Sequence, residues 1–424
     1  MEHRVYPLIE EQIYTEKLPN GLTVFVIPKP GFNKCFAFFA SDYGGVDRRF
    51  KLSGKWIDTP QGVAHFLEHE MFDMEYGDAL SRLSSNGANP NAYTSNDITA
   101  YYFECIDRFT ENLETLLSFV STPYFSPKSV EKEQAIITQE ILMGEDDPDY
   151  CVYYNLMKVL YSHNPIRDSV AGTVDSITDI THETLHSCHK VFYNPSNMAL
   201  CIAGDVEIEH IMDIAAKTLP GEPGELPERD YGAPEKLAPE SAYVSKSMDV
   251  SQSIFLAGCK TSPAAPGLPT LRRDIVSTIA LDLLAGHSSP LYIRLYSEGL
   301  VCGDFSASYD CAANTAYTIF GGESCDPERV FDEVKKEISR LSDSGLDRGL
   351  FERIKKAAVG SQIRSLNSLE SICVGVAGGY FRGYDALAAS DLLLSITPED
   401  IAGFYKEHLT PENMAISIVT PNEN

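Results

Sequence analysis

The segment THETLHSCHKVFYNPSNMALCI, residues 181–202, recurs as TPEDIAGFYKEHLTPENMAISI at residues 397–418. The copies align without a gap at an offset of 216 residues, about half of the 424-residue chain. Each copy reads as a helix that begins after a capping threonine, followed by a turn at a proline and an apolar strand. The repeat therefore predicts an internal duplication and two similar domains.

Between the copies lies LPGEPGELPERDYGAPEKLAPE, residues 219–240, which is crowded with proline, glycine and charge. Its lack of a periodic apolar pattern indicates an extended linker. We therefore expect one domain at residues 1–218 and a homologous domain at residues 241–424. Each mixes strands, such as residues 100–105, with helices, such as residues 108–121, so the expected fold class is α+β.

The composition excludes several classes of protein. A formal net charge of −27, from 34 basic and 61 acidic residues, argues against nucleic acid as a partner, because its phosphates would be repelled. No segment approaches the roughly 20 apolar residues of a membrane helix, and the first residues lack a signal-peptide stretch. The ten cysteines form no C-x-x-C pair, which is typical of reduced thiols. We therefore expect a cytoplasmic protein that binds neither membranes nor nucleic acid.

The stretch His65-Phe66-Leu67-Glu68-His69 carries the clearest chemistry in the chain. On a helix, two histidines four residues apart project from one face and can bind one Zn²⁺ with a position left open for water. Glu68 lies beside them as a candidate general base. The second half contains no H-x-x-E-H pattern, so we expect the metal chemistry in domain 1–218 and a homologous domain without metal at 241–424.

A third ligand is needed for a tight zinc site, and the segment 130–143 is the best candidate helix. Glu133 and Glu140 are seven residues apart on one face of it, beside an apolar row that would press the helix against the core. That row consists of Val130, Ile137 and Ile141.

A second histidine cluster, at positions 182, 186 and 189, offers another possible metal site. No carboxylate or cysteine cluster accompanies it, so an ordinary helix face is the favoured interpretation.

These motifs together resemble the pitrilysin/insulinase family of inverted-zincin metallopeptidases. The resemblance rests on the two duplicated halves and on four motifs: GVAHFLEH at residues 62–69, NAYTS at residues 91–95, Tyr101-Tyr102, and Glu133 with Glu140 seven residues later. It implies that His65, His69 and Glu140 bind one zinc ion, that Glu68 activates water, and that Glu133 is an auxiliary catalytic glutamate. It also implies that the two domains face each other as a clamshell.

Two further assignments follow from the resemblance. Counted strictly from the second histidine, the family spacing would select Glu145 as the third ligand, but Glu145 lies in an acidic turn and the local pattern favours Glu140. Asn91, Ala92 and Tyr93 resemble the family's edge strand, which pairs with an extended substrate peptide.

One departure from the family pattern concerns an Arg–Tyr pair that orients the substrate carbonyl in active members. Leu295 and Cys302 occupy the two positions here, and Arg294 is one residue out of place. The zinc motif without this pair resembles the bacterial YmfH-like, processing-peptidase-like branch. That resemblance implies a dimer and suggests a heterodimer with a related subunit that lacks the zinc motif; a homodimer and a self-sufficient two-domain chain are the alternatives.

The sequence therefore predicts a zinc-dependent endopeptidase that hydrolyses extended or unfolded peptides enclosed in a chamber. The alternative is a peptide-binding or assembly subunit of a peptidase complex, with little activity alone.

Overall fold

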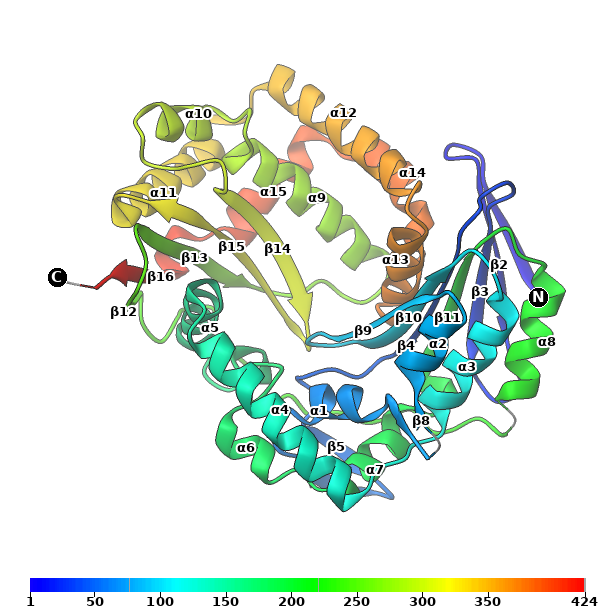
Figure 1. Ribbon diagram of the computed structural model, residues 1–424. Coiled ribbons are helices and arrows are strands. Elements are labelled where there is room, and N and C mark those ends of the chain that lie inside the picture. Colours follow the sequence, from blue (N-terminus) through cyan, green and yellow to red (C-terminus); the bar gives the residue numbers. More distant parts are fainter. Residues whose placement is uncertain (76, 220, 423–424) are drawn as a thin grey trace. The chain divides into compact units, whose positions relative to one another are not determined.

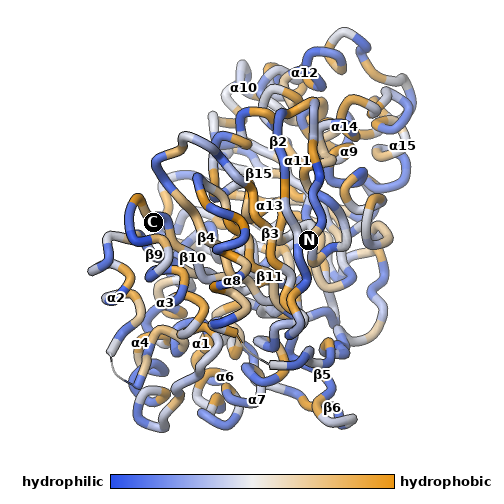
Figure 2. The backbone as a smooth tube through the Cα atoms, turned by 90° about the vertical axis from the view of Figure 1, so that its right-hand side faces the viewer, coloured by the Kyte–Doolittle hydropathy of each residue, from blue (hydrophilic) through white to orange (hydrophobic). Residues whose placement is uncertain are grey.

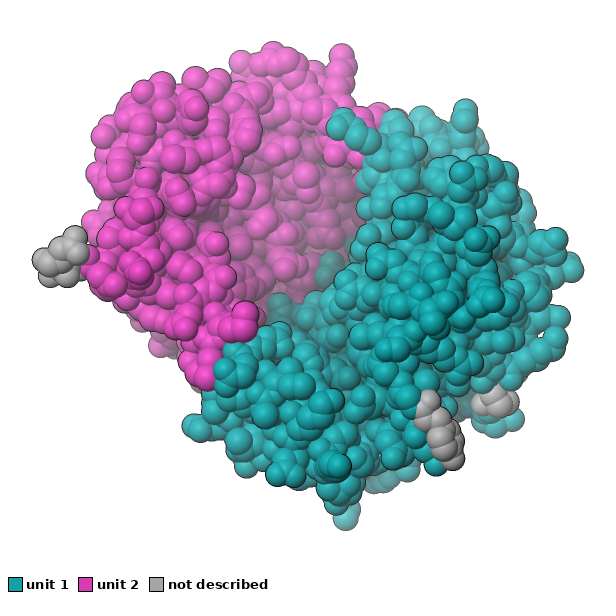
Figure 3. Space-filling model, viewed as in Figure 1, with its two compact units in different colours: residues 1–141, 169–231, 363–388 teal, residues 142–168, 232–362, 389–424 magenta. Residues whose placement is uncertain are grey.

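The computed structural model describes residues 1–75, 77–219 and 221–422 (Figure 1). Pro220 of the predicted linker and residues 423–424 of the predicted second domain lie outside the described residues. The chain forms two compact units, each assembled from three segments (Figure 3). Unit 1 contains residues 1–141, 169–231 and 363–388, and unit 2 contains residues 142–168, 232–362 and those from 389 onward. The division of the sequence at residues 218 and 241 stays a prediction.

Unit 1 is built on a seven-stranded mixed sheet with the order β1-β2-β3-β11-β4-β10-β9. Its strands are β1 (Glu2–Tyr6), β2 (Glu11–Lys17), β3 (Thr23–Pro28), β4 (Cys35–Ser41), β9 (Asn89–Thr94), β10 (Thr99–Cys105) and β11 (Met198–Gly204). The central strand β11 runs parallel to β3 and antiparallel to β4. Figure 2 shows hydrophobic residues along β3 and β11, as expected for strands that are covered on both faces.

Helices of unit 1 cover the two faces of this sheet unequally. They are α1 (Val63–Glu70), α2 (Ala79–Ser85), α3 (Phe109–Ser121), most of α4 (Pro127–Glu145), α6 (Val174–Thr178), α7 (His182–Phe192), α8 (Ile208–Thr218) and α13 (Leu369–Phe381). Alternate residues of β4 point to opposite faces: Ala37 and Phe39 join the core cluster that includes α1, α3 and α7. Phe36 and Phe38 join the cluster that includes α13.

Two short hairpins and two 3-10 turns complete unit 1. They are β5 (Arg49–Leu52) with β6 (Lys55–Asp58), β7 (Asp73–Met74) with β8 (Gly77–Asp78), η2 (Pro195–Asn197) and η3 (Ala386–Ala388).

The five strands of unit 2, in the order β12-β16-β13-β15-β14, repeat the order of five adjacent strands of unit 1, β3-β11-β4-β10-β9. Its strands are β12 (Tyr243–Met248), β13 (Ser253–Thr261), β14 (Ser306–Ala312), β15 (Thr315–Ser324) and β16 (Met414–Pro421). Its helices are α5 (Pro148–Leu160), α9 (Leu268–Ala285), α10 (Pro290–Ser297), α11 (Pro327–Ser344), most of α12 (Arg348–Ser365), α14 (Ala389–Ser395) and α15 (Pro398–His408), with η1 (Pro165–Arg167) and η4 (Pro411–Asn413). The fold is thus α+β with two homologous halves.

The repeat found in the sequence is a real structural unit. Helix α7 and strand β11 correspond to α15 and β16 at the same offset of 216 residues. The threonines that precede the helices cap them: the hydroxyl of Thr181 accepts from the Thr184 amide, and that of Thr397 accepts from the Asp400 amide. The predicted strand at 100–105 and helices at 108–121 and 130–143 are confirmed as β10, α3 and α4.

Each unit includes one helix from the other half of the sequence. Helix α13 has an apolar stripe with helical spacing and packs against β4 and β11 of unit 1. That stripe is Leu369, Ile372, Cys373, Val376 and Ala377. Conversely, α5 from the first half packs against β13 and β16 of unit 2.

The described residues of the predicted linker contain no helix, and the first part of this segment is anchored in unit 1. Residues 228–230 pair with β5 through hydrogen bonds from the Lys51 amide to the Glu228 carbonyl and from the Asp230 amide to the Arg49 carbonyl. The Arg229 guanidinium lies 2.9 Å from a carboxylate oxygen of Asp47 and 3.0 Å from one of Asp42. The Asp47 side chain is only 2% exposed, so this buried ion pair holds the linker in place.

In the described part of the chain, no helix is long and apolar enough to cross a membrane.

We expect Arg229→Gln to lower the free energy of unfolding by about 3 kcal/mol, because it leaves a buried carboxylate unpaired. Burial raises the pKa of Asp47 to about 7, above its unfolded value, so its stabilising protonated form is lost as the pH rises through 7. Without Arg229 the pKa of Asp47 rises further. The decrease in the free energy of unfolding caused by Arg229→Gln should therefore be greater at about pH 8.5 than at about pH 6. Urea unfolding of wild type and variant at both pH values measures this difference. Arg49→Gln, which removes a more exposed arginine of β5, should lower the free energy of unfolding much less. Equal losses in the two variants would contradict the role of Arg229 in the buried ion pair.

Candidate active site

Helix α1 presents the two histidines of the H-x-x-E-H stretch on one face. The other face of α1 is buried through Val63, Phe66 and Leu67. The rings of His65 and His69 lie side by side, with their centroids 4.6 Å apart. The helix begins after Gly62, which has a φ of 93°. A Cβ at Gly62 would lie 2.6 Å from the Ala171 carbonyl oxygen, so glycine is required at this close approach.

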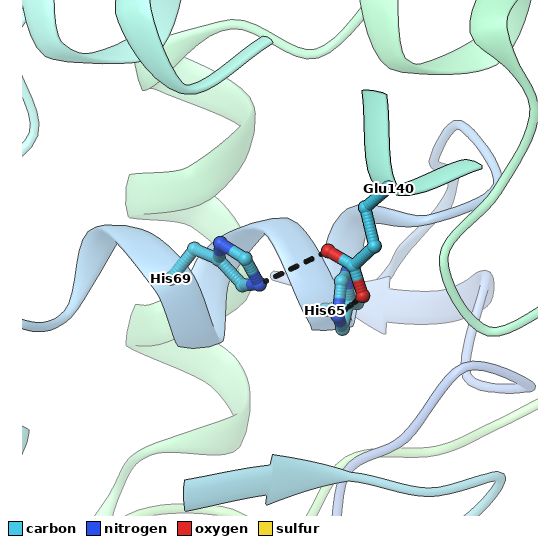
Figure 4. Close-up of side chains that lie close together, drawn as sticks. All are labelled: His65, His69 and Glu140. Carbon is cyan, nitrogen blue, oxygen red and sulfur yellow. Dashed lines mark ion pairs between the residues drawn. The ribbon is translucent and has the colours of Figure 1, made fainter. Parts of the chain in front are cut away.

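Helix α4 brings a carboxylate to both histidines (Figure 4). Glu140 lies 3.4 Å from Nε2 of His65 through Oε1 and 3.6 Å from Nε2 of His69 through Oε2. The helix is pressed against the core by Val130, Ile137 and Ile141, the predicted apolar row. The structure therefore brings together the three residues that the sequence predicts as ligands.

The donor set fits a zinc ion. One ligand atom from each of His65, His69 and Glu140 lies within 4.8 Å of the others. A tetrahedral ion with bonds of about 2.1 Å separates its ligands by about 3.4 Å, close to the spacing between the carboxylate and the two imidazoles. Two neutral imidazoles and one carboxylate are also the ligand types typical of catalytic zinc sites, which keep a position open. In the described residues, this is the one group of three metal-binding side chains.

The two histidines differ in how they are oriented. Oε1 of Glu133, two turns before Glu140 on α4, lies 2.8 Å from Nδ1 of His69, so Nδ1–H donates to Glu133 and Nε2 is free to face a metal. Burial lowers the pKa of His69, but the hydrogen bond to Glu133 and the nearby carboxylates raise it overall. Nδ1 of His65 is buried, and no described group accepts its hydrogen bond.

Glu68 lies on the buried side of the site. Its side chain is 8% exposed, and burial raises the pKa of its carboxyl even though both histidines oppose that change. Oε2 of Glu68 accepts a hydrogen bond of 3.0 Å from the Thr94 hydroxyl. The motif NAYTS contained Thr94, but nothing in the sequence pointed to this contact, because it joins residues 26 positions apart.

Asn91, Ala92 and Tyr93 lie on β9, at the edge of the unit 1 sheet. Among the described strands, β9 pairs only with β10, so its other edge can accept a further strand. Helix α1 contacts β9 directly. The predicted substrate-binding residues are therefore close to the helix that carries the histidines.

The remaining candidates lie elsewhere. Glu145 is exposed at the end of α4 and is absent from the group of metal-binding side chains. His182 pairs with Glu183, and Nε2 of His189 bonds to the Val120 carbonyl, as expected for an ordinary helix face. In unit 2, Leu295 is fully buried and Arg294 forms an ion pair with Glu333.

Comparison with known proteins identifies the family. Residues 53–174 match the family model described as Insulinase (Peptidase family M16), and residues 179–358 match the Peptidase M16 inactive domain. The zinc protease YmfH of Bacillus subtilis is 33% identical over 425 residues, which cover 98% of each chain. The chain belongs to the M16 family.

Other M16 relatives support this placement. The crystal structure of an M16-like peptidase from Alicyclobacillus acidocaldarius superposes with a TM-score of 0.93 at 34% identity and covers 97% of this chain and 99% of its own. A mitochondrial-processing peptidase subunit beta of Arabidopsis thaliana is 28% identical over 213 residues, 47% of this chain and 37% of that protein. The similarity to YmfH places the chain in the YmfH-like branch of the M16 family.

Zinc affinity tests the role of Glu140 as a ligand and of Glu133 as the group that orients His69. We expect Glu133→Gln to weaken zinc binding by about 10- to 100-fold, because a neutral amide replaces the charged acceptor that orients His69. Glu140→Gln should weaken it more, since a ligand is lost. Competition with a chromogenic chelator measures both. Glu145→Gln, at the end of the same helix, is the matched control and should bind zinc normally; a loss as large as that of Glu140→Gln would exclude this ligand set.

Proposed function

We propose that this M16 protein is a zinc-dependent endopeptidase that hydrolyses extended or unfolded peptides. The observation that carries the proposal is the convergence of His65, His69 and Glu140 beside the buried carboxylate of Glu68. Zinc held by the three ligands would polarise the attacking water and the carbonyl of the scissile bond.

The residues around the ligands have separate roles in this proposal. Glu68 takes the proton of the attacking water and returns it to the leaving amine. Glu133 fixes the orientation and tautomer of His69 through their 2.8 Å hydrogen bond. A structural zinc site would instead need a fourth cysteine or histidine ligand, and no such residue joins the group in the described part of the chain.

Strand β9 is the proposed substrate-binding element. A peptide that adds to its free edge, beside Asn91, Ala92 and Tyr93, would be held by backbone hydrogen bonds, which tolerate many sequences. Only an extended segment has its backbone groups free for such pairing. Enclosure of the substrate in a chamber would further restrict substrates to small or unfolded chains.

We further propose that the active form is a dimer in the cytoplasm, with a related subunit that lacks the zinc motif. The reason is the replacement of the Arg–Tyr pair: Leu295 is buried in unit 2, and the Arg294 side chain is engaged with Glu333. Without such donors the scissile carbonyl would be bound poorly. The Arabidopsis relative is itself a peptidase subunit, which agrees with a partner that supplies the missing pair.

A second candidate function is a peptide-binding or assembly subunit with little activity of its own. The match of residues 179–358 to the M16 inactive domain favours it. The presence of all three candidate ligands and of Glu68 favours the peptidase.

The test is hydrolysis of a mixed quenched-peptide library by the zinc-loaded chain, first alone and then together with a related subunit. Glu68→Gln should bind zinc like the wild type and lose at least about 1,000-fold in kcat, because the proton acceptor is removed while the ligands remain. Glu145→Gln serves as the control and should retain full activity.

The outcome with the chain alone also decides between the two functions. Hydrolysis that Glu68→Gln abolishes would establish a self-sufficient peptidase and contradict the need for a partner. Zinc binding without hydrolysis, by the chain alone and after addition of a related subunit, would favour the assembly role. Failure to bind zinc would contradict both the metal site and the peptidase.

A further inference from the structure

The carboxylate of Glu68 has one hydrogen-bond donor among the described residues, the hydroxyl of Thr94. The bond is 3.0 Å long and reaches Oε2. Glu68 is 8% exposed, so little solvent can replace this donor. A glutamate side chain has three rotatable bonds, and the last of them is broad and roughly two-fold. The hydrogen bond to Thr94 therefore selects one orientation of the Glu68 carboxylate.

Thr94 is itself held firmly. It is the last residue of β9 and lies opposite Thr99 of β10. The turn between these strands is closed by a 2.8 Å hydrogen bond from the Ser95 amide to the Ile98 carbonyl. As a β-branched residue on a strand, Thr94 also has a restricted χ1 angle. The pairing of β9 with β10 and the restricted χ1 angle therefore fix the position of the Thr94 hydroxyl.

The proton of the Thr94 hydroxyl is available for Glu68. The neighbouring Thr99 hydroxyl lies 2.8 Å from the Tyr43 carbonyl oxygen and 3.4 Å from the Thr94 hydroxyl. The single proton of Thr99 belongs to the shorter contact, with Tyr43. Thr94 then donates its own proton to Oε2 of Glu68 and leaves the other carboxylate oxygen, Oε1, to accept a proton.

We propose that Thr94 is a positioning residue for Glu68, which couples the geometry of the proton acceptor to the edge strand β9. This inference rests on the proposed peptidase function. The strand whose free edge would bind the substrate also carries, at its end, the hydroxyl that orients the base. Substrate binding depends on the β9 backbone, whereas the orientation of Glu68 depends on the Thr94 side chain.

The two roles can be separated by substitution. Thr94→Val keeps the shape and the β propensity of the side chain but removes the donor. We expect kcat to fall about ten-fold, equivalent to about 1.4 kcal/mol, while KM and zinc affinity stay within about two-fold of the wild-type values. Thr94→Ser, which keeps the hydroxyl, should restore most of kcat. In the Glu68→Gln background, Thr94→Val should have no further effect, because the two changes remove the same function.

Thr23→Val is the matched control. Thr23 is a buried threonine of the same sheet, and its hydroxyl bonds to the Tyr380 hydroxyl at 2.9 Å. The variant loses one hydrogen bond without touching Glu68. It should therefore lose a similar amount of stability as Thr94→Val but retain the wild-type kcat.

A second readout needs neither zinc nor activity. The infrared difference spectrum between wild type and Glu68→Gln, recorded on the metal-free protein at alkaline pH, isolates the carboxylate band of Glu68. Thr94→Val should move this antisymmetric stretching band to higher frequency, because a hydrogen-bond donor is lost, and Thr94→Ser should leave it in place.

The outcomes distinguish this inference from the proposed function. A band that Thr94→Val leaves unchanged, or a kcat that Thr94→Ser and Thr94→Val lower equally, would overturn the positioning role. A chain that binds zinc but hydrolyses no peptide would contradict self-sufficient catalysis, and the infrared band would still decide the role of Thr94.

Discussion

The contact between α4 and α1 is the constraint on which the candidate site depends. Three apolar side chains press α4 against the core, and this packing places Glu133 and Glu140, two turns apart, against the histidines of α1. Neither helix could assemble the site alone, because two histidines on one helix supply only two of the ligands. Burial of Val130, Ile137 and Ile141, each worth about 1.5–3 kcal/mol, provides the free energy that holds a cluster of carboxylates and imidazoles together.

The duplicated halves share a scaffold but not its chemistry. The last residue of β4, Ser41, donates to the Phe192 carbonyl, and the equivalent Cys259 of β13 donates to the His408 carbonyl. The next residue in each half binds the linker with opposite charge. Asp42 pairs with Arg229 in unit 1, and Lys260 lies 3.7 Å from Glu235 in unit 2. Equivalent backbone positions thus carry different side chains, just as the metal-binding motif of α1 is replaced, at the same offset of 216 residues, by the apolar residues Leu281, Leu284 and Ala285 of α9.

Predictions from the sequence succeeded where the information is local or periodic. The repeat predicted two α+β halves, and the family comparison confirmed that duplication. The spacing of four between His65 and His69, and of seven between Glu133 and Glu140, placed each pair on one helix face. The preference for Glu140 over Glu145 agrees with the structure, since Glu140 lies in the group with the two histidines and Glu145 does not. The roles of these residues in binding zinc remain a proposal.

The sequence by itself determined the duplication, the helix–turn–strand units and the set of residues able to bind a metal. Capping, apolar periodicity and ligand spacing involve residues that are close together in the sequence, within a single helix or strand. Only the tertiary structure decided which distant groups meet. Thr94 reaches Glu68, Arg229 pairs with the buried Asp47, and α13 and α5 pack in the unit of the other half. These contacts depend on strand order and on the burial of surfaces far apart along the chain, so no local pattern encodes them.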